Sequence, residues 1–313
     1  MQAAVIEAGE LHWTERPDPV PGDTELLVAV RAAGINAADL AQRLGFYPAP
    51  PGAPADIPGM ELAGEVVGVG AQVTRFSTGD RVMALVGGGA QATMATVDEA
   101  HALAVPDGID WAAAGGFPEA YSTAFDALWS QGQLQVGERV LVTGAAGGVG
   151  TAAVQLAATT GARVVASVRD PQRHAAIEAL GAAVAIEPGD VANHGPYDVL
   201  LELVGAPSLV AALPSLATGA RVIVIGVGAG ATFELDLRRL MMSRIRISAS
   251  TLRARDRTAK AVVAAGVARH VLPLLASGRV GVPISATVPM ADVAAAYEQF
   301  ASGGKLGKIV LVT

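Results

Sequence analysis

In the first part of the chain, hydrophobic residues form short runs that are separated by Pro, Gly and Asp. Three runs rich in β-branched residues are Leu26 to Arg31, Glu61 to Val69 and Arg81 to Val86. Runs of this length between turn residues predict β-strands. Residues 1 to about 120 are therefore expected to form a compact, barrel-like β domain.

From about residue 122, short apolar strands alternate with segments of helical periodicity. This alternation needs crossover connections, so it predicts a parallel sheet covered on both faces. We expect six strands, which fit a doubly wound α/β fold. They span Val140 to Thr143, Arg163 to Ser167, Val184 to Ile186, Asp198 to Val204, Arg221 to Ile225, and Ile245 to Ala249.

The last part of the chain resumes the character of the first. A helical run is expected at Asp256 to Ser277, a strand at Val282 to Val288, an amphipathic helix at Ala291 to Ala301, and a last strand at Lys308 to Val312. The prediction is a dinucleotide-binding domain, 122–253, inserted into a β-rich domain made of 1–121 and 254–313. The ligand crevice is then expected between the domains, beside the carboxyl ends of the parallel strands.

The strand starting at Val140 runs into the turn Gly144-Ala-Ala-Gly-Gly-Val-Gly150, and the helical run Thr151 to Thr160 follows. A turn with so few side chains lets a pyrophosphate approach the unpaired N–H groups of a helix N-terminus. In a chain with 37 glycines such a turn can also serve helix packing alone, but its flanks favour binding. The predicted cofactor contacts here are Gly147, Gly148, Val149 and Gly150.

Composition excludes several classes of function. The 313 residues include no cysteine, so disulfides, thiolate nucleophiles and thiolate metal ligands are excluded. The net charge of −7, without a Lys/Arg cluster, argues against nucleic acid as a partner. The uncharged window Val140 to Ala162 is interrupted by the glycine turn, and the N-terminus lacks the pattern of a secretory signal. We expect no membrane span and a cytoplasmic location.

The glycine turn also fits the short-chain dehydrogenases, which use a Tyr followed four residues later by a Lys. This chain lacks that pair, because Pro51, Phe125, Leu201 and Ala301 stand four residues after its four tyrosines. The large domain that precedes the turn also differs from that family.

The motifs instead resemble the zinc-free quinone oxidoreductases (zeta-crystallin-like) of the medium-chain dehydrogenase/reductase superfamily, over nearly the whole chain. Gly87-Gly-Gly-Ala-Gln91 and Ser250-Thr-Leu-Arg-Ala-Arg-Asp256 look most like the tumour-suppressor-inducible branch. The resemblance implies a Rossmann domain inserted into a GroES-like catalytic domain. It is carried by Gly34-Ile-Asn-Ala-Ala-Asp39, Gly45-Phe-Tyr47, Pro58-Gly-Met-Glu-Leu-Ala-Gly64, Pro118-Glu-Ala-Tyr-Ser-Thr-Ala124, Ala145-Ala-Gly-Gly-Val-Gly150 and Gly304-Lys-Leu-Gly-Lys-Ile-Val310.

Zinc-dependent members of the superfamily have a Cys where Asn36 stands and a His where Met60 stands. The five histidines of this chain are scattered without ligand spacing, so we predict no metal. Without a Lewis acid to stabilise an alkoxide, the expected reaction is reduction of a conjugated acceptor by hydride.

The expected cofactor is NADPH, since the second Rossmann strand ends at Ser167-Val168-Arg169 without an acidic residue, and Arg173 follows in the next helix. Arg169 and Arg173 are alternatively solvated surface charges, with Asp170 weakening their field. The predicted contacts also include Ser167, Val204, Gly205 and Gly226. Two features depart from the family: Pro188 replaces a phosphate-contacting Tyr, and the connection Gly189 to Tyr197 is too short for a full crossover helix.

The resemblance nominates Asn36 and Tyr47 as catalytic residues, and Asn36 and Thr123 as neighbours of the nicotinamide. Asn36 would donate a hydrogen bond to the acceptor oxygen as charge grows on it. From sequence alone Asn36 is also suited to cap a turn, Tyr47 to be a loop aromatic, and Thr123 to start a helix. Glu61 is either a remnant of the zinc-enzyme architecture or the partner of a cation.

The function expected from these features is NADPH-dependent, zinc-independent reduction of quinones. One alternative is a reductase of 2-enoyl thioesters or other activated alkenes. Another, of a different class, is an NADPH-binding protein with little catalysis. The resemblance also implies a homodimer that pairs edge strands, for which Ile245 to Ala249 is the candidate.

Overall fold

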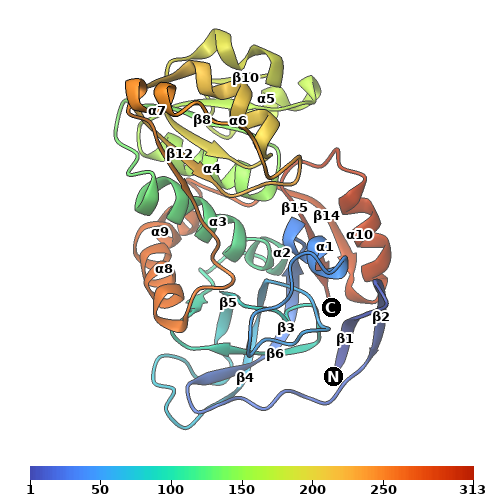
Figure 1. Ribbon diagram of the computed structural model, residues 1–313. Helices are drawn as coiled ribbons and strands as arrows, with labels where there is room; N and C mark the ends of the chain where they lie inside the picture. The colour runs from blue at the N-terminus through green and yellow to red at the C-terminus, as the bar shows by residue number, and fades with distance from the viewer. The chain divides into compact units, whose positions relative to one another are not determined.

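The computed structural model describes all residues from 1 to 313 and divides the chain into two compact units (Figure 1). Unit 1 consists of Met1–Ser122 and Leu252–Thr313, and unit 2 of Thr123–Thr251. Unit 2 is therefore inserted into unit 1. The boundaries expected from the sequence were after residues 121 and 253.

Unit 1 contains a two-stranded sheet and a seven-stranded sheet. In the larger sheet the strand order is β14-β15-β3-β4-β5-β7, and β6 also pairs with β3. The strands predicted in this part are confirmed, with β4 and β15 at the predicted bounds. The strands are β1 (Gln2–Glu7), β2 (Glu10–Glu15), β3 (Glu25–Gly34), β4 (Glu61–Val69), β5 (Arg81–Leu85), β6 (Met94–Asp98), β7 (Ala102–Ala104), β14 (Ile284–Pro289) and β15 (Lys308–Val312).

The helices of this part of the chain are short except for two near the C-terminus. They are α1 (Ala37–Arg43), α2 (Trp111–Gly115), α3 (Pro118–Phe125), α8 (Arg257–His270), α9 (Leu272–Ala276), the 3-10 turn η5 (Met290–Asp292) and α10 (Val293–Ala301). The single helical run predicted from Asp256 to Ser277 is divided between α8 and α9. Pro273, which has no N–H to donate, lies in the first turn of α9.

By length and composition alone, α8 and α9 together are apolar enough to cross a membrane, with a mean hydropathy of 1.4 over Arg257–Ala276. Core helices of globular proteins meet the same test. In this structure α8 buries Val263 and Val267.

Unit 2 is built on a six-stranded parallel sheet with the order β10-β9-β8-β11-β12-β13, which confirms the predicted doubly wound fold. Val140, Leu141 and Val142 are fully buried, as expected for a strand covered on both faces. The strands are β8 (Arg139–Val142), β9 (Arg163–Ser167), β10 (Val184–Ile186), β11 (Tyr197–Glu202), β12 (Leu216–Val224) and β13 (Arg246–Ala249).

Helix α4 contacts β8 and β9, α5 contacts β10, and α7 contacts β12 (Figure 1). The short connection before β11 contains only the 3-10 helix η3, which confirms that the usual crossover helix is reduced. The helical segments are the π-helix η1 (Asp126–Gln131), α4 (Gly148–Thr159), η2 (Pro171–Arg173), α5 (His174–Ala179), η3 (Pro188–His194), α6 (Ala206–Ala212), η4 (Leu213–Ser215) and α7 (Leu237–Ser243).

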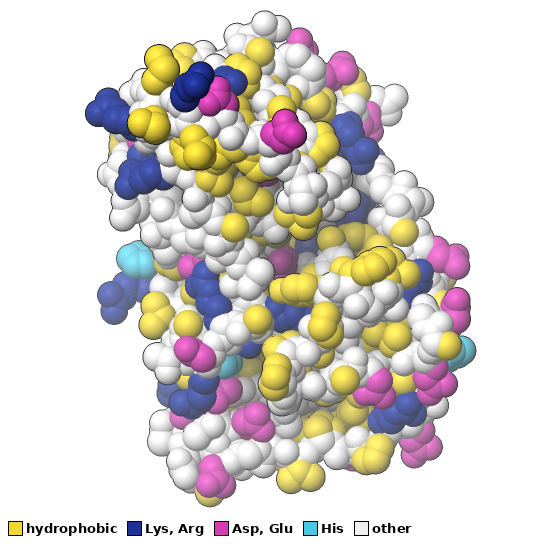
Figure 2. Space-filling view, viewed as in Figure 1, with side chains coloured by type: hydrophobic (Ala, Val, Ile, Leu, Met, Phe, Trp, Pro, Cys, Tyr) yellow, Lys and Arg dark blue, Asp and Glu magenta, His cyan; other side chains and the backbone are white.

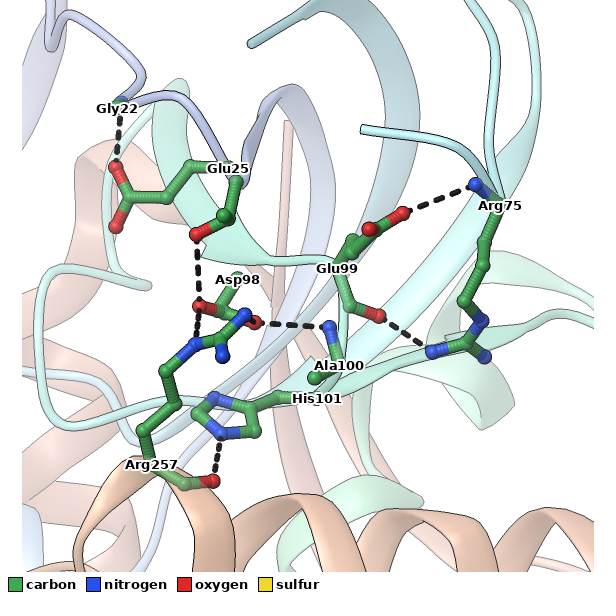
Figure 3. Close-up of polar contacts among 9 residues, drawn as sticks. Gly22, Glu25, Arg75, Asp98, Glu99, Ala100, His101 and Arg257 are labelled. Carbon is green, nitrogen blue, oxygen red and sulfur yellow. Dashed lines mark hydrogen bonds and ion pairs between the residues drawn. The ribbon is translucent and has the colours of Figure 1, made fainter. Parts of the chain in front are cut away.

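The turn between β6 and β7 ties the C-terminal segment of unit 1 to the N-terminal one (Figure 3). Asp98 accepts two hydrogen bonds from the Arg257 guanidinium, at 2.5 and 3.0 Å, and a ring nitrogen of His101 lies 2.9 Å from the Arg257 carbonyl oxygen. The Glu99 carboxylate accepts the N–H groups of Thr74 and Arg75. The start of α8 is therefore fixed on strands that lie more than 150 residues earlier in the chain.

Asn36 is the residue that precedes helix α1, and Asp39 stabilises this end of the helix. The Asp39 carboxylate accepts the Asn36 N–H at 2.8 Å and the Gly59 N–H at 3.2 Å. Asn36 occupies the N-cap position, and Asp39 is the third residue of the helix. Burial raises the pKa of Asp39 from 3.8 to about 6, although the Asn36 N–H and the charges of Lys308 and Arg253 oppose this increase. Asp39 is thus a buried carboxyl that links α1 to the segment before β4.

We expect Asp39 to make the protein less stable as pH rises from about 4 to about 6. The folded-state pKa lies above the unfolded value of 3.8, so the folded chain holds the proton more tightly, and this stabilisation is lost as pH rises through about 6. The change is at most about 3 kcal/mol, from ~1.4 kcal/mol per pKa unit. Asp39→Asn should remove this pH dependence, which thermal unfolding between pH 4 and 7 would measure.

The matched control is Asp110→Asn, because Asp110 also caps a helix but is exposed. Its melting temperature should follow that of the wild type at every pH. Parallel pH curves for the wild type and Asp39→Asn would show that Asp39 does not titrate in this range.

Candidate functional site

The turn between β8 and α4 leaves backbone N–H groups free at a helix N-terminus. Gly144 has a positive φ of 59°, and a Cβ on Gly150 would come within 2.6 Å of the Ala145 Cα and the Gly144 oxygen. The N–H groups of Gly148 and Val149 have no acceptor in the structure, and no side chain caps the helix. These donors and the helix dipole fit the pyrophosphate of a dinucleotide.

The other cofactor-binding residues predicted in unit 2 also follow the carboxyl ends of parallel strands. Ser167 ends β9, Val204 and Gly205 follow β11, and Gly226 follows β12. The loops after β11 and β12 hold each other through hydrogen bonds from Ala206 N–H to Gly230 and from Ala229 N–H to Val204. The structure therefore places these residues along the edge of the sheet that is formed by the carboxyl ends of its strands. This is the edge at which the prediction expects the cofactor.

Glu202 organises this edge and was not nominated from the sequence. One of its carboxylate oxygens accepts the Thr143 hydroxyl at 3.0 Å and the N–H groups of Val204 and Gly205 at 2.7 and 2.8 Å. These bonds bend the chain after Glu202, so β11 ends two residues before the predicted Val204. An acidic residue that ends an apolar strand was the available indication in the sequence.

The two arginines expected at the adenosine end differ in their surroundings. Arg169 is exposed and makes no hydrogen bond or ion pair in the structure. The Arg173 side chain donates to Asp170 at 3.0 Å. Arg169 is therefore available to an incoming anion, whereas Arg173 is partly neutralised.

Of the residues predicted near the nicotinamide, Thr123 lies in α3, is buried, and begins unit 2. Asn36 belongs to unit 1. Asn36 is therefore described by its contacts within unit 1.

Asn36 lies in a buried cluster of polar side chains in unit 1. Its amide nitrogen is 2.9 Å from a Glu61 carboxylate oxygen, and its amide oxygen is 2.6 Å from the Lys308 ammonium. Lys308 and Glu61 form an ion pair at 2.5 Å, in which the two side chains are 3% and 0% exposed. The structure thus identifies Lys308 as the cation for Glu61, a partner that the sequence left open.

Tyr47 lies in the proline-rich loop after α1, which the buried Arg253 holds in place. The guanidinium of Arg253 donates to the carbonyl oxygens of Tyr47 and Gly87 at 3.1 and 2.7 Å and to the Gln42 side chain at 2.5 Å. It also lies 5.3 Å from the centre of the Tyr47 ring. The Tyr47 hydroxyl has no hydrogen-bond partner in the structure, so it is free to bind a ligand.

The start of the same loop is apolar and exposed. Leu44 and Phe46 are 57% and 82% exposed, and hydrophobic side chains gather over α1 in the space-filling view (Figure 2). Such side chains suit contact with a flat apolar molecule. Sequence reasoning nominated Tyr47 here but neither Arg253 nor its partner Gln42.

The family resemblance places Asn36 and Met60 at two positions where zinc-dependent members have ligands. The structure has no group of three or more His, Cys, Asp or Glu side chains that could hold a metal ion. What unit 1 offers instead is a side-chain amide, a free phenol and an apolar loop. This set can bind an oxygen-bearing acceptor by hydrogen bonds but supplies no nucleophile.

Two family models match the sequence. Residues 22–107 match the alcohol dehydrogenase GroES-like domain, and residues 148–266 match the zinc-binding dehydrogenase domain. The first match lies in unit 1, and most of the second lies in unit 2.

Among curated proteins, the chain is 31% identical over 232 residues to the quinone oxidoreductase-like protein 2 homolog of Nematostella vectensis, covering 71% of this chain and 63% of that protein. It is 29% identical to the acryloyl-coenzyme A reductase of Metallosphaera sedula over the full length of both chains. The polyketide synthase GfsB of Streptomyces halstedii is 35% identical over 219 residues, or 68% of this chain. The chain spans only 4% of that synthase.

Solved structures match over the whole chain. The quinone oxidoreductase of Pseudomonas syringae pv. Tomato DC3000 has a TM-score of 0.88 and 26% identity, with all of both chains covered. A mycobacterial protein complexed with NADPH has a TM-score of 0.89 and 27% identity, again over all of both chains. The specific branch suggested by the sequence motifs is not distinguished by these similarities. With its GroES-like unit and its inserted parallel-sheet unit, the chain belongs to the medium-chain dehydrogenase/reductase superfamily.

Proposed function

We propose that this protein is an NADPH-dependent quinone reductase that works without a metal. The observation that carries the proposal is the Asn36 cluster: where zinc-dependent relatives have metal ligands, a buried amide is held between Glu61 and Lys308. An amide N–H stabilises negative charge on an acceptor oxygen by a hydrogen bond. It does not stabilise an alkoxide as a Lewis acid does, so reduction of a conjugated carbonyl is favoured over oxidation of an alcohol.

In unit 2, the free N–H groups at the start of α4 would hold the pyrophosphate, and Arg169 and Arg173 the 2′-phosphate. Ser167, Val204, Gly205 and Gly226 line the same edge of the sheet. Bound NADPH supplies a hydride. The residues themselves bind and orient, because no side chain of this edge has to exchange a proton.

In unit 1, the Asn36 amide would donate to the acceptor oxygen, and the Tyr47 hydroxyl would provide a second donor. Leu44 and Phe46 would cover the faces of a flat acceptor and exclude water from it. Lys308 donates its protons within the cluster, so the one proton that a quinone needs in addition to the hydride would come from solvent. The quinone oxidoreductases among the similar proteins support this acceptor class.

A second candidate is reduction of an enoyl thioester. The similarity to an acryloyl-coenzyme A reductase over the full length of both chains favours it. An enoyl thioester also carries a carbonyl oxygen that the Asn36 amide can bind, so unit 1 alone does not separate the two substrates.

We also propose that the enzyme is a cytoplasmic homodimer. Strand β13 is at the edge of the parallel sheet, so one side of its backbone is unpaired. Leu237, Met241 and Met242 on the neighbouring α7 are exposed. A dimer would cover both features, and light scattering that returned the monomer mass of 31.5 kDa would refute it.

The proposed function predicts which acceptors oxidise the cofactor. In steady-state assays against an ortho-quinone, para-benzoquinone and a short enoyl-CoA, we expect turnover of the quinones with NADPH preferred over NADH. Turnover of the enoyl-CoA alone would make the protein a thioester reductase. Tight NADPH binding without turnover of any acceptor would make it a binding protein.

The cofactor assignment predicts that substitution of Arg169 weakens the binding of NADPH more than that of NADH. Arg169→Ala should raise the KM for NADPH about tenfold, equivalent to ~1.4 kcal/mol, because one charge-assisted contact to the 2′-phosphate is lost. The KM for NADH should stay nearly constant, since NADH lacks that phosphate. The measurement is initial rate against the concentration of each cofactor at saturating quinone.

The matched control is Arg163→Ala, since Arg163 is exposed at the opposite end of the same strand, β9. Asp170→Asn should act in the opposite direction and lower the KM for NADPH, because it removes the negative charge beside Arg169 and Arg173. An equal effect of Arg169→Ala on both cofactors would contradict the assignment.

A further inference from the structure

The orientation of the Asn36 amide is fixed by two buried charges of opposite sign. The Lys308 ammonium faces the amide oxygen at 2.6 Å, and the Glu61 carboxylate faces the amide nitrogen at 2.9 Å. An ammonium group only donates hydrogen bonds, and a carboxylate only accepts them. Rotating the amide by 180° would therefore create two repulsive contacts in a site from which water is excluded.

Nearly all the polar groups of this cluster are already occupied. Lys308 donates to the Ile35 carbonyl oxygen at 3.1 Å, to Asn36 and to Glu61, which accounts for its three protons. The second carboxylate oxygen of Glu61 accepts the Glu119 N–H at 2.8 Å. One amide hydrogen of Asn36 binds Glu61, and the other has no partner in the structure. That hydrogen is the donor that the cluster leaves for a ligand.

Glycine at position 34 gives Glu61 the space that it needs. A Cβ at Gly34 would overlap the Glu61 carboxylate and would lie 3.0 Å from the Gly115 carbonyl oxygen. Gly34 ends β3, which pairs with both β4 and β15, the strands that begin with Glu61 and Lys308. The two charges are thus brought to Asn36 by the two strands that flank β3 in the sheet.

We propose that Lys308 and Glu61 are positioning residues that lock the Asn36 amide so that it presents an N–H, and never its carbonyl, to the substrate. The atom bound there must then be a hydrogen-bond acceptor, such as a quinone or other carbonyl oxygen, and not a hydroxyl or amine donor. This inference rests on the proposed function for the identity of the substrate. The lock itself is a property of the folded chain without substrate.

The sequence allows a direct test, because Asn36 and Asn193 are its only asparagines. Protein labelled with ¹⁵N-asparagine will give two side-chain amide signals by NMR, and the exposed Asn193 serves as an internal reference. We expect the Asn36 protons to be well separated and to exchange with solvent much more slowly than those of Asn193. Adding an ortho-quinone together with NADP⁺, which cannot reduce it, should shift one Asn36 proton much more than the other.

Kinetics provide the second readout. Lys308→Met should lower kcat for quinone about tenfold or more, while the Kd for NADPH stays unchanged. This is less than the roughly 10²–10³-fold cost of removing an oxyanion donor outright, because the Asn36 amide is still present but no longer held. Lys308→Arg keeps a donor for the amide oxygen and should restore most of kcat. The matched control is Arg31→Met, since Arg31 and Glu65 form an exposed ion pair between β3 and β4 of the same sheet.

The outcomes separate this inference from the proposed function. Asn36 protons that exchange as fast as those of Asn193 would overturn the lock, whether or not the variants fold. Wild-type kcat in Lys308→Met would overturn it as well. Slow exchange in a protein that reduces no acceptor would support the lock and refute the proposed function.

Discussion

The ion pair between Glu61 and Lys308 is the interaction on which unit 1 most depends. The two side chains are almost fully buried, and their residues are separated by more than 240 positions in the sequence. Removing one partner of such a pair leaves an uncompensated charge, at a cost of about 3–5 kcal/mol. The pair therefore requires β4 and β15 to reach the same place, beside the end of β3 and the start of α1. The pair thereby joins the segment of unit 1 that precedes the inserted unit in the sequence to the segment that follows it.

In unit 2, a single buried carboxylate with neutral hydrogen-bond donors connects neighbouring strands. Glu202 collects a hydroxyl and two backbone N–H groups at the end of β11, and its own carbonyl oxygen accepts the N–H groups of Ile225 and Gly226. It thereby joins the ends of three neighbouring strands. In both units a buried acid that does not itself have to react thus holds part of the proposed site: Glu61 holds Asn36, and Glu202 holds Val204, Gly205 and Gly226.

The sequence predicted the elements well and the buried polar contacts poorly. Strand periodicity and the glycine turn are local, so the parallel sheet, β4 and the reduced crossover at η3 were all predictable. Asn36 and Tyr47 were nominated only through a family resemblance, and their roles stay predictions. Lys308 and Arg253 lie in motifs that carry the family resemblance but were given no role, because their partners lie more than 160 residues away in the sequence. The end of β11 was misplaced for a similar reason, since a side-chain bond overrides the β propensity of Leu203 and Val204.

The two proposed donors to the substrate differ in how firmly they are held. Asn36 is fixed by charges on two strands, Glu61 on β4 and Lys308 on β15, and by Asp39 in the first turn of α1, so its position depends on the sheet. Tyr47 is fixed only through its carbonyl oxygen and the face of its ring, and the loop that carries it keeps Phe46 in solvent. A rigid donor and an adaptable apolar loop together are expected to bind substrates that share an acceptor oxygen but differ in shape. The range of acceptors that this protein takes is therefore expected to depend on the loop after α1, while the amide and its two charges require an acceptor oxygen in each of them.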